Sequence, residues 1–247
     1  MYVTLTRILK NFLNIIAPDF EFRIQRILKS LMRNSPQKKI RVLDLGGGAG
    51  TIWRNNSFYE AQINKGLLEI TLIDAHIKDS SYDGLNYMQG ELPGCLMKFN
   101  DNSFDLVISC DVLEHLPKHD GYLMLYEMER IALDRAFIFS PNGFLKQSPN
   151  VGNTHNAHIS SWSPKEMRNF KWQNHRGHSG FRFLFGTYGH PRFSSTYIFL
   201  NRILLILLNM TRVSVTRTPS VAFSFSSIFV KKANNQNLNF DRINLDL

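Results

Sequence analysis

The stretch that decides the fold is Val42-Leu43-Asp44-Leu45-Gly46-Gly47-Gly48-Ala49-Gly50-Thr51. An apolar run leads into a loop with four glycines, so the pattern predicts a buried strand at Ile40–Leu45 followed by a turn. Glycines adopt positive φ and let the backbone approach a ligand closely. A helix after such a loop presents unpaired N–H groups and the positive end of its dipole to negative charge. The stretch therefore predicts a strand–loop–helix unit that binds a ligand.

Further apolar runs follow at intervals and predict the rest of a sheet. The expected strands are Leu68–Ile73, Leu85–Met88, Phe104–Ser109, Ala136–Phe139, Phe181–Tyr188 and Val221–Val230. A helical periodicity covers Gly121–Leu133, and Ser163-Pro164-Lys165-Glu166 has the residues of a helix start. Apolar strands that alternate with helices are typical of a parallel sheet covered on both faces. The fold class expected is α/β and Rossmann-like.

Two further segments, one at the N-terminus and one between the late strands, are predicted to add helices to this sheet. The first 39 residues predict two amphipathic helices separated at Pro18 and Asp19, and we expect residues 1–39 to form an N-terminal helical cover. Residues 40–247 then form the main domain. Within it, a helical segment at Ser195–Met210 predicts an insertion, residues 190–220, between the two late strands.

An acid after the second strand indicates the kind of ligand. Asp74 follows the glycine loop by 24 residues, and a carboxylate at this position accepts hydrogen bonds from both hydroxyls of a ribose. The dinucleotide fingerprint G-x-G-x-x-G fails in both registers, because Thr51 or Trp53 occupies the place of its third glycine. A P-loop fails too, because no Gly-Lys-Ser/Thr follows. The ligand expected is therefore a nucleoside-containing cofactor other than a dinucleotide.

The pattern that fits is Asp-x-Gly-x-Gly-x-Gly from Asp44 to Gly50, which resembles motif I of the class I S-adenosylmethionine-dependent methyltransferases. Three later segments continue the resemblance: Gln89–Pro93, Asn100–Val107 and Ser109–Pro117, whose Leu-Glu-His resembles the type 11 and type 23 branch. The resemblance covers about residues 40–142. It implies a seven-stranded, mostly parallel sheet whose last strand is antiparallel and forms a hairpin with the sixth.

The same resemblance implies S-adenosylmethionine as cofactor. In that family the glycine loop surrounds the methionine part, the acid after strand two holds the ribose, and an acid after strand three lies near the adenine. The cofactor residues implied are Asp44, Gly46, Gly48, Gly50, Asp74, Glu91 and Asp111.

The acceptor side is less determined by the sequence. A sulfonium cofactor carries an activated methyl group, so a base is needed only when the acceptor is a hydroxyl or a protonated amine. His115 follows strand four at the carboxyl edge of the sheet, beside Asp111 and Glu114, and we expect it to be the catalytic base. The alternative is that Glu114 and His115 only shape the turn and contact the cofactor.

Four histidines occur in two pairs, His155-x-x-His158 and His175-x-x-His178. Their spacing suggests zinc, but no cysteine or flanking acid completes the pattern, so no metal is expected. We expect polar loops here. One interpretation is a loop over the substrate in which His155, His158 or Trp162 meets the acceptor, and the other is solvated loop histidines.

Composition narrows the partners. Lys and Arg number 29 against 20 acids, which gives a net charge of +9 and favours an anionic partner. The basic residues are scattered, and the Asn/Asp-Pro-Pro-Tyr/Phe motif of base-methylating enzymes is absent after strand four. We therefore expect methylation of a small-molecule, lipid-linked or glycan acceptor, on oxygen. An RNA methyltransferase and a non-catalytic nucleotide-binding domain remain as alternatives.

Cellular location follows from weaker signals. Two cysteines, Cys95 and Cys110, exclude a disulfide scaffold and indicate the cytoplasm. No secretory signal and no transmembrane segment is expected. The first helix is basic and amphipathic, and Ser195–Met210 is apolar with Arg202 and Arg212 nearby. Such helices suit peripheral contact with the inner face of a membrane, although they also suit covering the core or a dimer partner.

Overall fold

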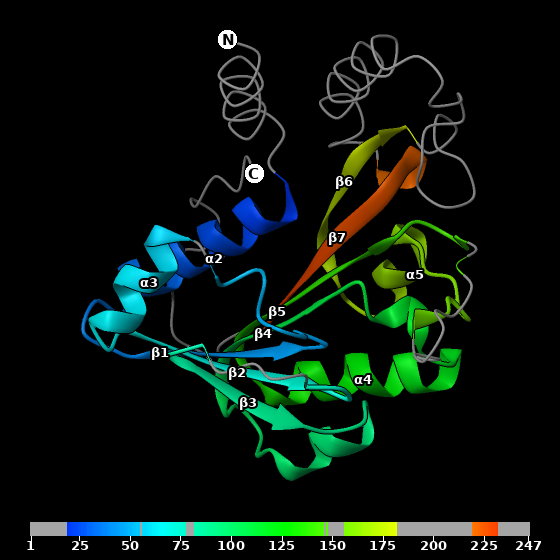
Figure 1. The fold of residues 1–247 in the computed structure, drawn as a ribbon. Helices are drawn as coiled ribbons and strands as arrows, with labels where there is room; N and C mark the ends of the chain where they lie inside the picture. Colours follow the sequence, from blue (N-terminus) through cyan, green and yellow to red (C-terminus); the bar gives the residue numbers. More distant parts are fainter. Residues whose placement is uncertain are drawn as a thin grey trace, which may run out of the picture.

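The computed structural model describes residues 19–54, 56–77, 82–145, 147, 156–181 and 219–231. Within these ranges the chain forms one seven-stranded sheet with the order β3-β2-β1-β4-β5-β7-β6 (Figure 1). Its strands are β1 (Ile40–Leu45), β2 (Leu68–Asp74), β3 (Leu85–Gln89), β4 (Phe104–Cys110), β5 (Ala132–Pro141), β6 (Gln173–Phe181) and β7 (Ala222–Val230). Strands β1 to β5 run parallel, and β7 is antiparallel to both β5 and β6. The predicted fold class is confirmed.

Helices cover both faces of the sheet (Figure 1). On one face α2 (Phe20–Asn34) and α3 (Ser57–Asn64) pack through Ile24, Leu28 and Tyr59 onto the sheet. On the other face α4 (Lys118–Ile131) and α5 (Pro164–Asn169) contribute Met124 and Met167 to a second core cluster. Short 3-10 helices are η1 (Gly94–Lys98), η2 (Leu113–His115) and η5 (Pro219–Val221). The central strands are buried on both faces, as their continuous apolar sequences require.

Two helix starts are capped by side chains, of which the one at Ser163 was predicted. Asp19 caps α2, because its Oδ1 accepts a hydrogen bond of 2.9 Å from the backbone N–H of Phe22. Ser163 caps α5 with Pro164 at the first position, and its Oγ accepts from the backbone N–H of Glu166 at 3.2 Å.

The sixth strand lies earlier in the chain than predicted. The prediction was Phe181–Tyr188, but β6 is Gln173–Phe181, eight residues earlier at its start. It lies at the edge of the sheet and, among the described residues, pairs with β7 alone, so its sequence needs no continuous apolar run. His175 and His178 therefore lie on a strand, not in the polar loop that was expected. Except for Phe181, the predicted strand falls outside the described residues.

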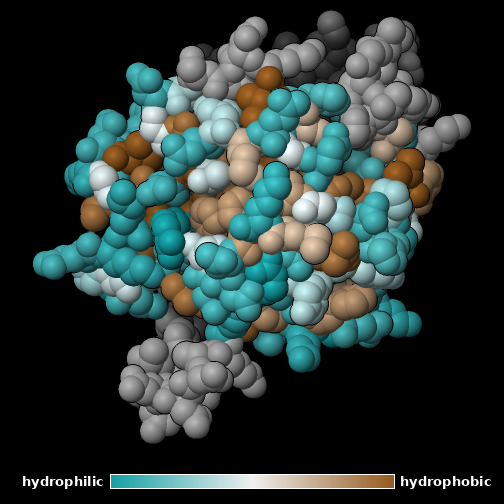
Figure 2. Space-filling view, turned by 90° about the horizontal axis from the view of Figure 1, so that it is seen from below, coloured by the Kyte–Doolittle hydropathy of each residue, from teal (hydrophilic) through white to brown (hydrophobic). Residues whose placement is uncertain are grey.

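Some predictions fall wholly or largely outside the described ranges. These are the first helix within residues 1–18 and the insertion at 190–220, of which only 219 and 220 are described. The division into a cover and a main domain stays a prediction. Within the described residues, no helix combines the length and hydropathy needed to cross a bilayer. Seen from below, hydrophilic and hydrophobic residues are interspersed over the surface (Figure 2).

Candidate active site

An open cavity lies at the carboxyl ends of β1, β2, β3 and β4, where open α/β sheets bind ligands. Its lining residues are Gly46, Asp74, Ala75, His76, Gly90, Glu91, Leu92, Asp111, Val112, His115, Leu116 and Asn156. The structure thus brings together five of the predicted site residues: Gly46, Asp74, Glu91, Asp111 and His115. They come from four successive strand ends, because parallel strands place these ends at one edge.

Asp74 is held in place by backbone donors. Its Oδ2 accepts from the N–H of Gly48 and its Oδ1 from the N–H of His76, each at 2.9 Å. A carboxylate has about four acceptor sites, so lone pairs remain for two hydroxyl groups in the cavity. Ala75 and His76 also line the cavity and were not predicted. Their position directly after Asp74 is the sequence signal that could have indicated them.

The glycines of the loop serve different purposes. Gly46, Gly48 and Gly50 all have positive φ, at 71°, 51° and 79°. A Cβ at Gly46 would lie 2.3 Å from Val112 Cγ2, and one at Gly50 would lie 2.8 Å from Leu85 Cδ1. At Gly48 a Cβ would meet only Asp74 Oδ2, at 3.8 Å. Packing within the protein therefore excludes side chains at Gly46 and Gly50, whereas Gly48 faces open space that a ligand can fill.

Asp44 lies beneath the loop. It is 1% exposed, and its Oδ2 accepts a hydrogen bond of 2.7 Å from Trp53 Nε1. A Cβ at Gly47 would lie 2.8 Å from the same oxygen, so the carboxylate supports the loop directly. Burial raises the pKa of Asp44 to about 7. The geometry gives Asp44 a supporting position, and Trp53 is a partner that the sequence pattern did not reveal.

The chain after β4 makes a tight turn at the cavity. Asp111 has φ of 53°, a conformation uncommon for a residue with a side chain, and its N–H donates to Phe139 O at 2.9 Å. Glu114 in η2 is 2% exposed, and its Oε2 accepts from Ser140 Oγ at 3.0 Å. Burial, together with the adjacent Asp111 carboxylate, raises the pKa of Glu114.

His115 lines the cavity, and one of its ring nitrogens carries a lone pair. Its Nδ1 lies 3.0 Å from Ala157 O, and since a carbonyl only accepts, Nδ1 carries the proton and Nε2 is bare. Burial lowers the pKa of His115 below 6.5, so the neutral imidazole prevails at neutral pH. This is the protonation state that a general base requires.

Residues 156–162 fold back over η2 and bring His158 to His115. The backbone N–H groups of Ile159 and Ser160 donate to Glu114 O at 2.8 and 3.1 Å. The imidazole rings of His115 and His158 lie 4.7 Å apart between centroids, edge to face at 73°. His158 Nδ1 donates to Leu145 O at 2.7 Å. The predicted substrate loop thus places His158 against the catalytic candidate, and Asn156 lines the cavity.

The other predicted acceptor contacts lie elsewhere. Trp162 is 1% exposed and donates from Nε1 to Leu113 O at 3.0 Å, which gives it a packing role. His155 lies outside the described residues. His175 and His178 bond to Ser227 and Ser226 of β7, each at 2.7 Å. Two of the four histidines, His175 and His178, therefore form hydrogen bonds at the edge of the sheet.

A comparison with protein families supports the interpretation of the loop. Residues 43–139 match the family model described as a methyltransferase domain, of type 11. This range holds the glycine loop, Asp74, Glu91, Asp111 and His115. No curated protein matches the sequence.

Solved structures of low sequence identity resemble the chain. A SAM-dependent methyltransferase from Archaeoglobus fulgidus is 14% identical, with a TM-score of 0.47, over 86% of this chain and all of that one. The magnesium protoporphyrin IX methyltransferase of Synechocystis, solved with bound SAH, is 13% identical, with a TM-score of 0.46, over 86% of this chain and 83% of that one. The 1,6-didemethyltoxoflavin-N1-methyltransferase of Burkholderia thailandensis is 12% identical, with a TM-score of 0.44, over 84% and 78%. Residues 43–139 are thus similar in sequence to a methyltransferase domain, and the strand order and the glycine loop after β1 agree with that similarity.

Proposed function

We propose that this protein transfers a methyl group from S-adenosylmethionine to an oxygen atom of a small-molecule, lipid-linked or glycan acceptor. The observation that carries the choice of oxygen is the bare Nε2 of His115 at the cavity wall. An acceptor hydroxyl has a proton to lose, and a neutral imidazole within reach can take it. The proposal therefore makes His115 the catalytic base.

The cavity fits the cofactor through its loop and its acids. Asp74 would bind the ribose hydroxyls, Glu91 would lie at the adenine end, and the open space at Gly48 would receive the methionine part. Gly46, Gly50 and Asp44 would maintain the shape of the loop, and Asp111 would contact the cofactor from β4. When bound, the sulfonium supplies an activated methyl group. The protein then has to position the acceptor and exclude water.

Cofactor binding is tested by calorimetry with S-adenosylhomocysteine. Asp74→Asn removes charge-assisted hydrogen bonds worth about 1.5–3 kcal/mol each, so we expect affinity to fall about 10-fold or more. Gly48→Ala should abolish measurable binding, because its methyl group would occupy the ligand space. Gly66→Ala is the matched control: Gly66 has φ of 68° and open surroundings, but lies in the turn before β2, at the opposite end of that strand from Asp74. Equal affinity in all four proteins would refute the assignment.

The acceptor class is tested with a labelled methyl group. Purified protein is incubated with methyl-labelled cofactor and, separately, with a lipid extract, a water-soluble metabolite extract and total RNA. Label in the first two fractions supports the proposal. A base-labile ester or a base-stable ether as the product identifies oxygen as the acceptor atom. Label confined to RNA would support the alternative that the net charge of +9 favours. Cofactor binding without any labelled product would support the non-catalytic alternative.

We also propose action in the cytoplasm, with peripheral contact to the inner face of a membrane when the acceptor is lipid-linked. The net charge of +9 supports contact with anionic lipid. Flotation with vesicles containing anionic phospholipid at low salt tests it. Protein that stays at the bottom of the gradient would remove the membrane contact and leave the methyl transfer untouched.

A further inference from the structure

We propose that Glu114, His115 and His158 form a binding site for one divalent transition-metal ion at the wall of the cavity. One ligand atom from each of the three side chains lies within 4.8 Å of the others. In a tetrahedral zinc site, bonds of about 2.0–2.2 Å separate neighbouring ligand atoms by about 3.3–3.6 Å. The three groups need to approach one another by only about 1 Å to close around an ion.

Both imidazoles are prepared as metal ligands. His115 and His158 each direct Nδ1 to a backbone carbonyl, Ala157 O and Leu145 O, so the nitrogen left bare on each ring is Nε2. A second hydrogen bond from the far ring nitrogen to a carbonyl or carboxylate is the usual support of a metal-bound histidine, because it fixes the tautomer and the ring orientation.

The carboxylate of Glu114 lacks the partners that a buried charge requires. Its Oε2 accepts from Ser140, but its Oε1 is buried and receives no hydrogen bond from the described residues. The Asp111 carboxyl forms a side-chain hydrogen bond with Glu114, so the two acids share a proton, and no described lysine or arginine forms an ion pair with either acid. A bound cation would replace this shared proton and stabilise both acids in their ionised form.

The donor set indicates the class of ion. Two imidazoles and one carboxylate suit zinc or another first-row transition ion and suit magnesium or calcium poorly, since those prefer oxygen ligands. His115 lines the cavity, so an ion bound to it would lie at the cavity wall. Such an ion lowers the pKa of a bound hydroxyl, whose proton passes to water before its oxygen takes the methyl carbon and the carbon–sulfur bond breaks.

This inference goes beyond the proposed function and alters one part of it. In the metal-loaded protein His115 Nε2 is a ligand, and the ion makes the acceptor hydroxyl acidic. In the metal-free protein His115 remains the base. The site departs from the sequence expectation of no metal, because Glu114 and His158 are 44 residues apart and their spacing matches no short motif.

The test is a titration of untagged, chelator-treated protein with Co²⁺, followed by visible absorption. We expect ligand-field bands that saturate at one equivalent and disappear on addition of one equivalent of Zn²⁺, with one metal per chain by elemental analysis after dialysis. Glu114→Gln and His158→Asn should each weaken Co²⁺ binding at least 10-fold. His119→Asn is the matched control, since His119 is an exposed histidine on α4, and it should bind Co²⁺ as the wild type does.

The site would be overturned if the wild-type protein showed no Co²⁺ bands. It would also be overturned if Glu114→Gln and His158→Asn bound Co²⁺ as well as His119→Asn does. The wild-type result decides even if a variant fails to fold, and circular dichroism checks each variant. S-adenosylhomocysteine affinity is measured on the same metal-free samples. Loss of metal binding with intact cofactor binding would remove this inference alone, whereas intact metal binding without cofactor affinity would remove the proposed function alone.

Discussion

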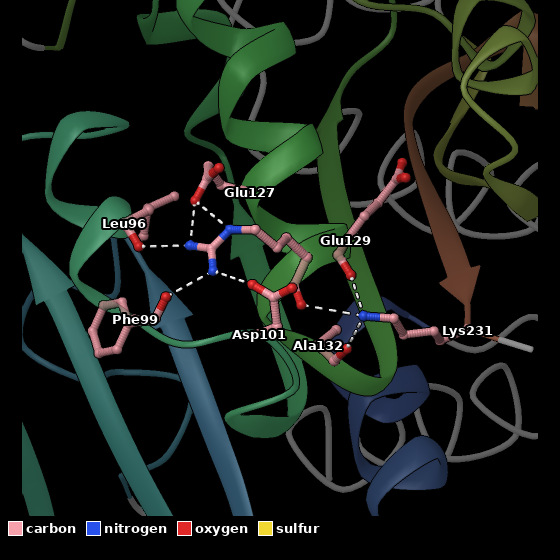
Figure 3. Close-up of polar contacts among 8 residues, drawn as sticks. Leu96, Phe99, Asp101, Glu127, Glu129, Ala132 and Lys231 are labelled. Carbon is pink, nitrogen blue, oxygen red and sulfur yellow. Dashed lines mark hydrogen bonds and ion pairs between the residues drawn. The ribbon is translucent and has the colours of Figure 1, made fainter. Parts of the chain in front are cut away.

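Two clusters of polar groups lie near the two ends of α4, and they differ in how completely their charges are paired. At its last turn, Arg130 uses all five of its N–H donors: it bonds to Glu127 twice, to Asp101, and to the carbonyls of Leu96 and Phe99, at 2.6–3.2 Å (Figure 3). Just before its first turn, Asp111 and Glu114 lie together without a cation from the described residues. The helix between them has 14 residues and is therefore about 20 Å long.

Lys231 completes the paired cluster. Its Nζ donates to the carbonyls of Glu129, Arg130 and Ala132, at 3.0–3.2 Å (Figure 3). These carbonyls are among those that a helix end leaves without partners, and a cation there also complements the helix dipole. The carboxylates at this end thus have permanent partners within the chain. The comparison teaches that one end of α4 is built to stabilise the fold and the other retains free bonding capacity for a ligand.

The largest effect is expected from a substitution beside the unpaired cluster of Asp111 and Glu114. His115→Asn, assayed in a chelator, should lower the methyl-transfer rate about 10²–10⁴-fold while leaving S-adenosylhomocysteine affinity nearly unchanged. The wild-type rate should fall as pH falls through a pKa below 6.5, because protonation removes the Nε2 lone pair. The variant should lose this limb of the pH–rate profile. An unchanged rate and profile would give His115 a purely structural role.

The second prediction concerns a substitution that removes the central residue of the paired cluster, Arg130. Arg130→Ala should lower the free energy of unfolding by about 2–3 kcal/mol, because two carboxylates and two carbonyls lose their donor. Urea unfolding measures it, and cofactor affinity of the folded protein should not change. Arg130→Lys is the matched control: it retains the charge but not the planar fork, so it should recover only part of the loss. A stability equal to that of the wild type would show that the cluster is dispensable.

A third prediction extends the comparison to Asp44, a buried acid that accepts from Trp53 and forms no ion pair within the described part of the chain. Asp44 has a raised pKa of about 7, so the folded state holds a proton that the unfolded state releases near pH 4. Its contribution to stability therefore declines as pH rises from about 4 to about 7. Asp44→Asn should remove this decline and be more stable than the wild type at pH 8, by about 1 kcal/mol.

Thermal unfolding from pH 5 to pH 8 measures the effect. Asp44→Ala is the control, because it cannot accept from Trp53 and should be less stable throughout. A wild-type-like pH dependence in Asp44→Asn would contradict the prediction.

The smallest expected effect concerns the strained backbone of the unpaired cluster. Asp111→Gly should raise the free energy of unfolding by about 0.5–1 kcal/mol, because glycine adopts the φ of 53° without steric cost. Asp111→Ala removes the same carboxylate but retains the strain, so the difference between the two variants isolates the backbone term. Both should bind S-adenosylhomocysteine more weakly than the wild type. A more stable variant with undiminished affinity would mean that Asp111 has no role in the site.

Local patterns in the sequence are sufficient for much of the fold. The central strands are continuous apolar runs because both of their faces are buried, so Ile40–Leu45 is predicted at the bounds that the structure has. The glycine loop and Asp74 are predictable because a strand end, a positive φ and a carboxylate at a fixed distance each constrain the residue type. The edge strand β6 escapes this reasoning, since it pairs on one side only and carries polar residues such as His175 and His178.

The sequence by itself determined the class of fold, the glycine loop and the acid that faces the cavity, because these depend on residues close together along the chain. Only the tertiary structure decided that His158 meets His115, that Ser140 binds Glu114, and that Trp162 packs in the core. These contacts join segments 26 to 49 residues apart. No local propensity encodes them, because they arise when β4, β5 and the segment 156–162 converge at one edge of the sheet.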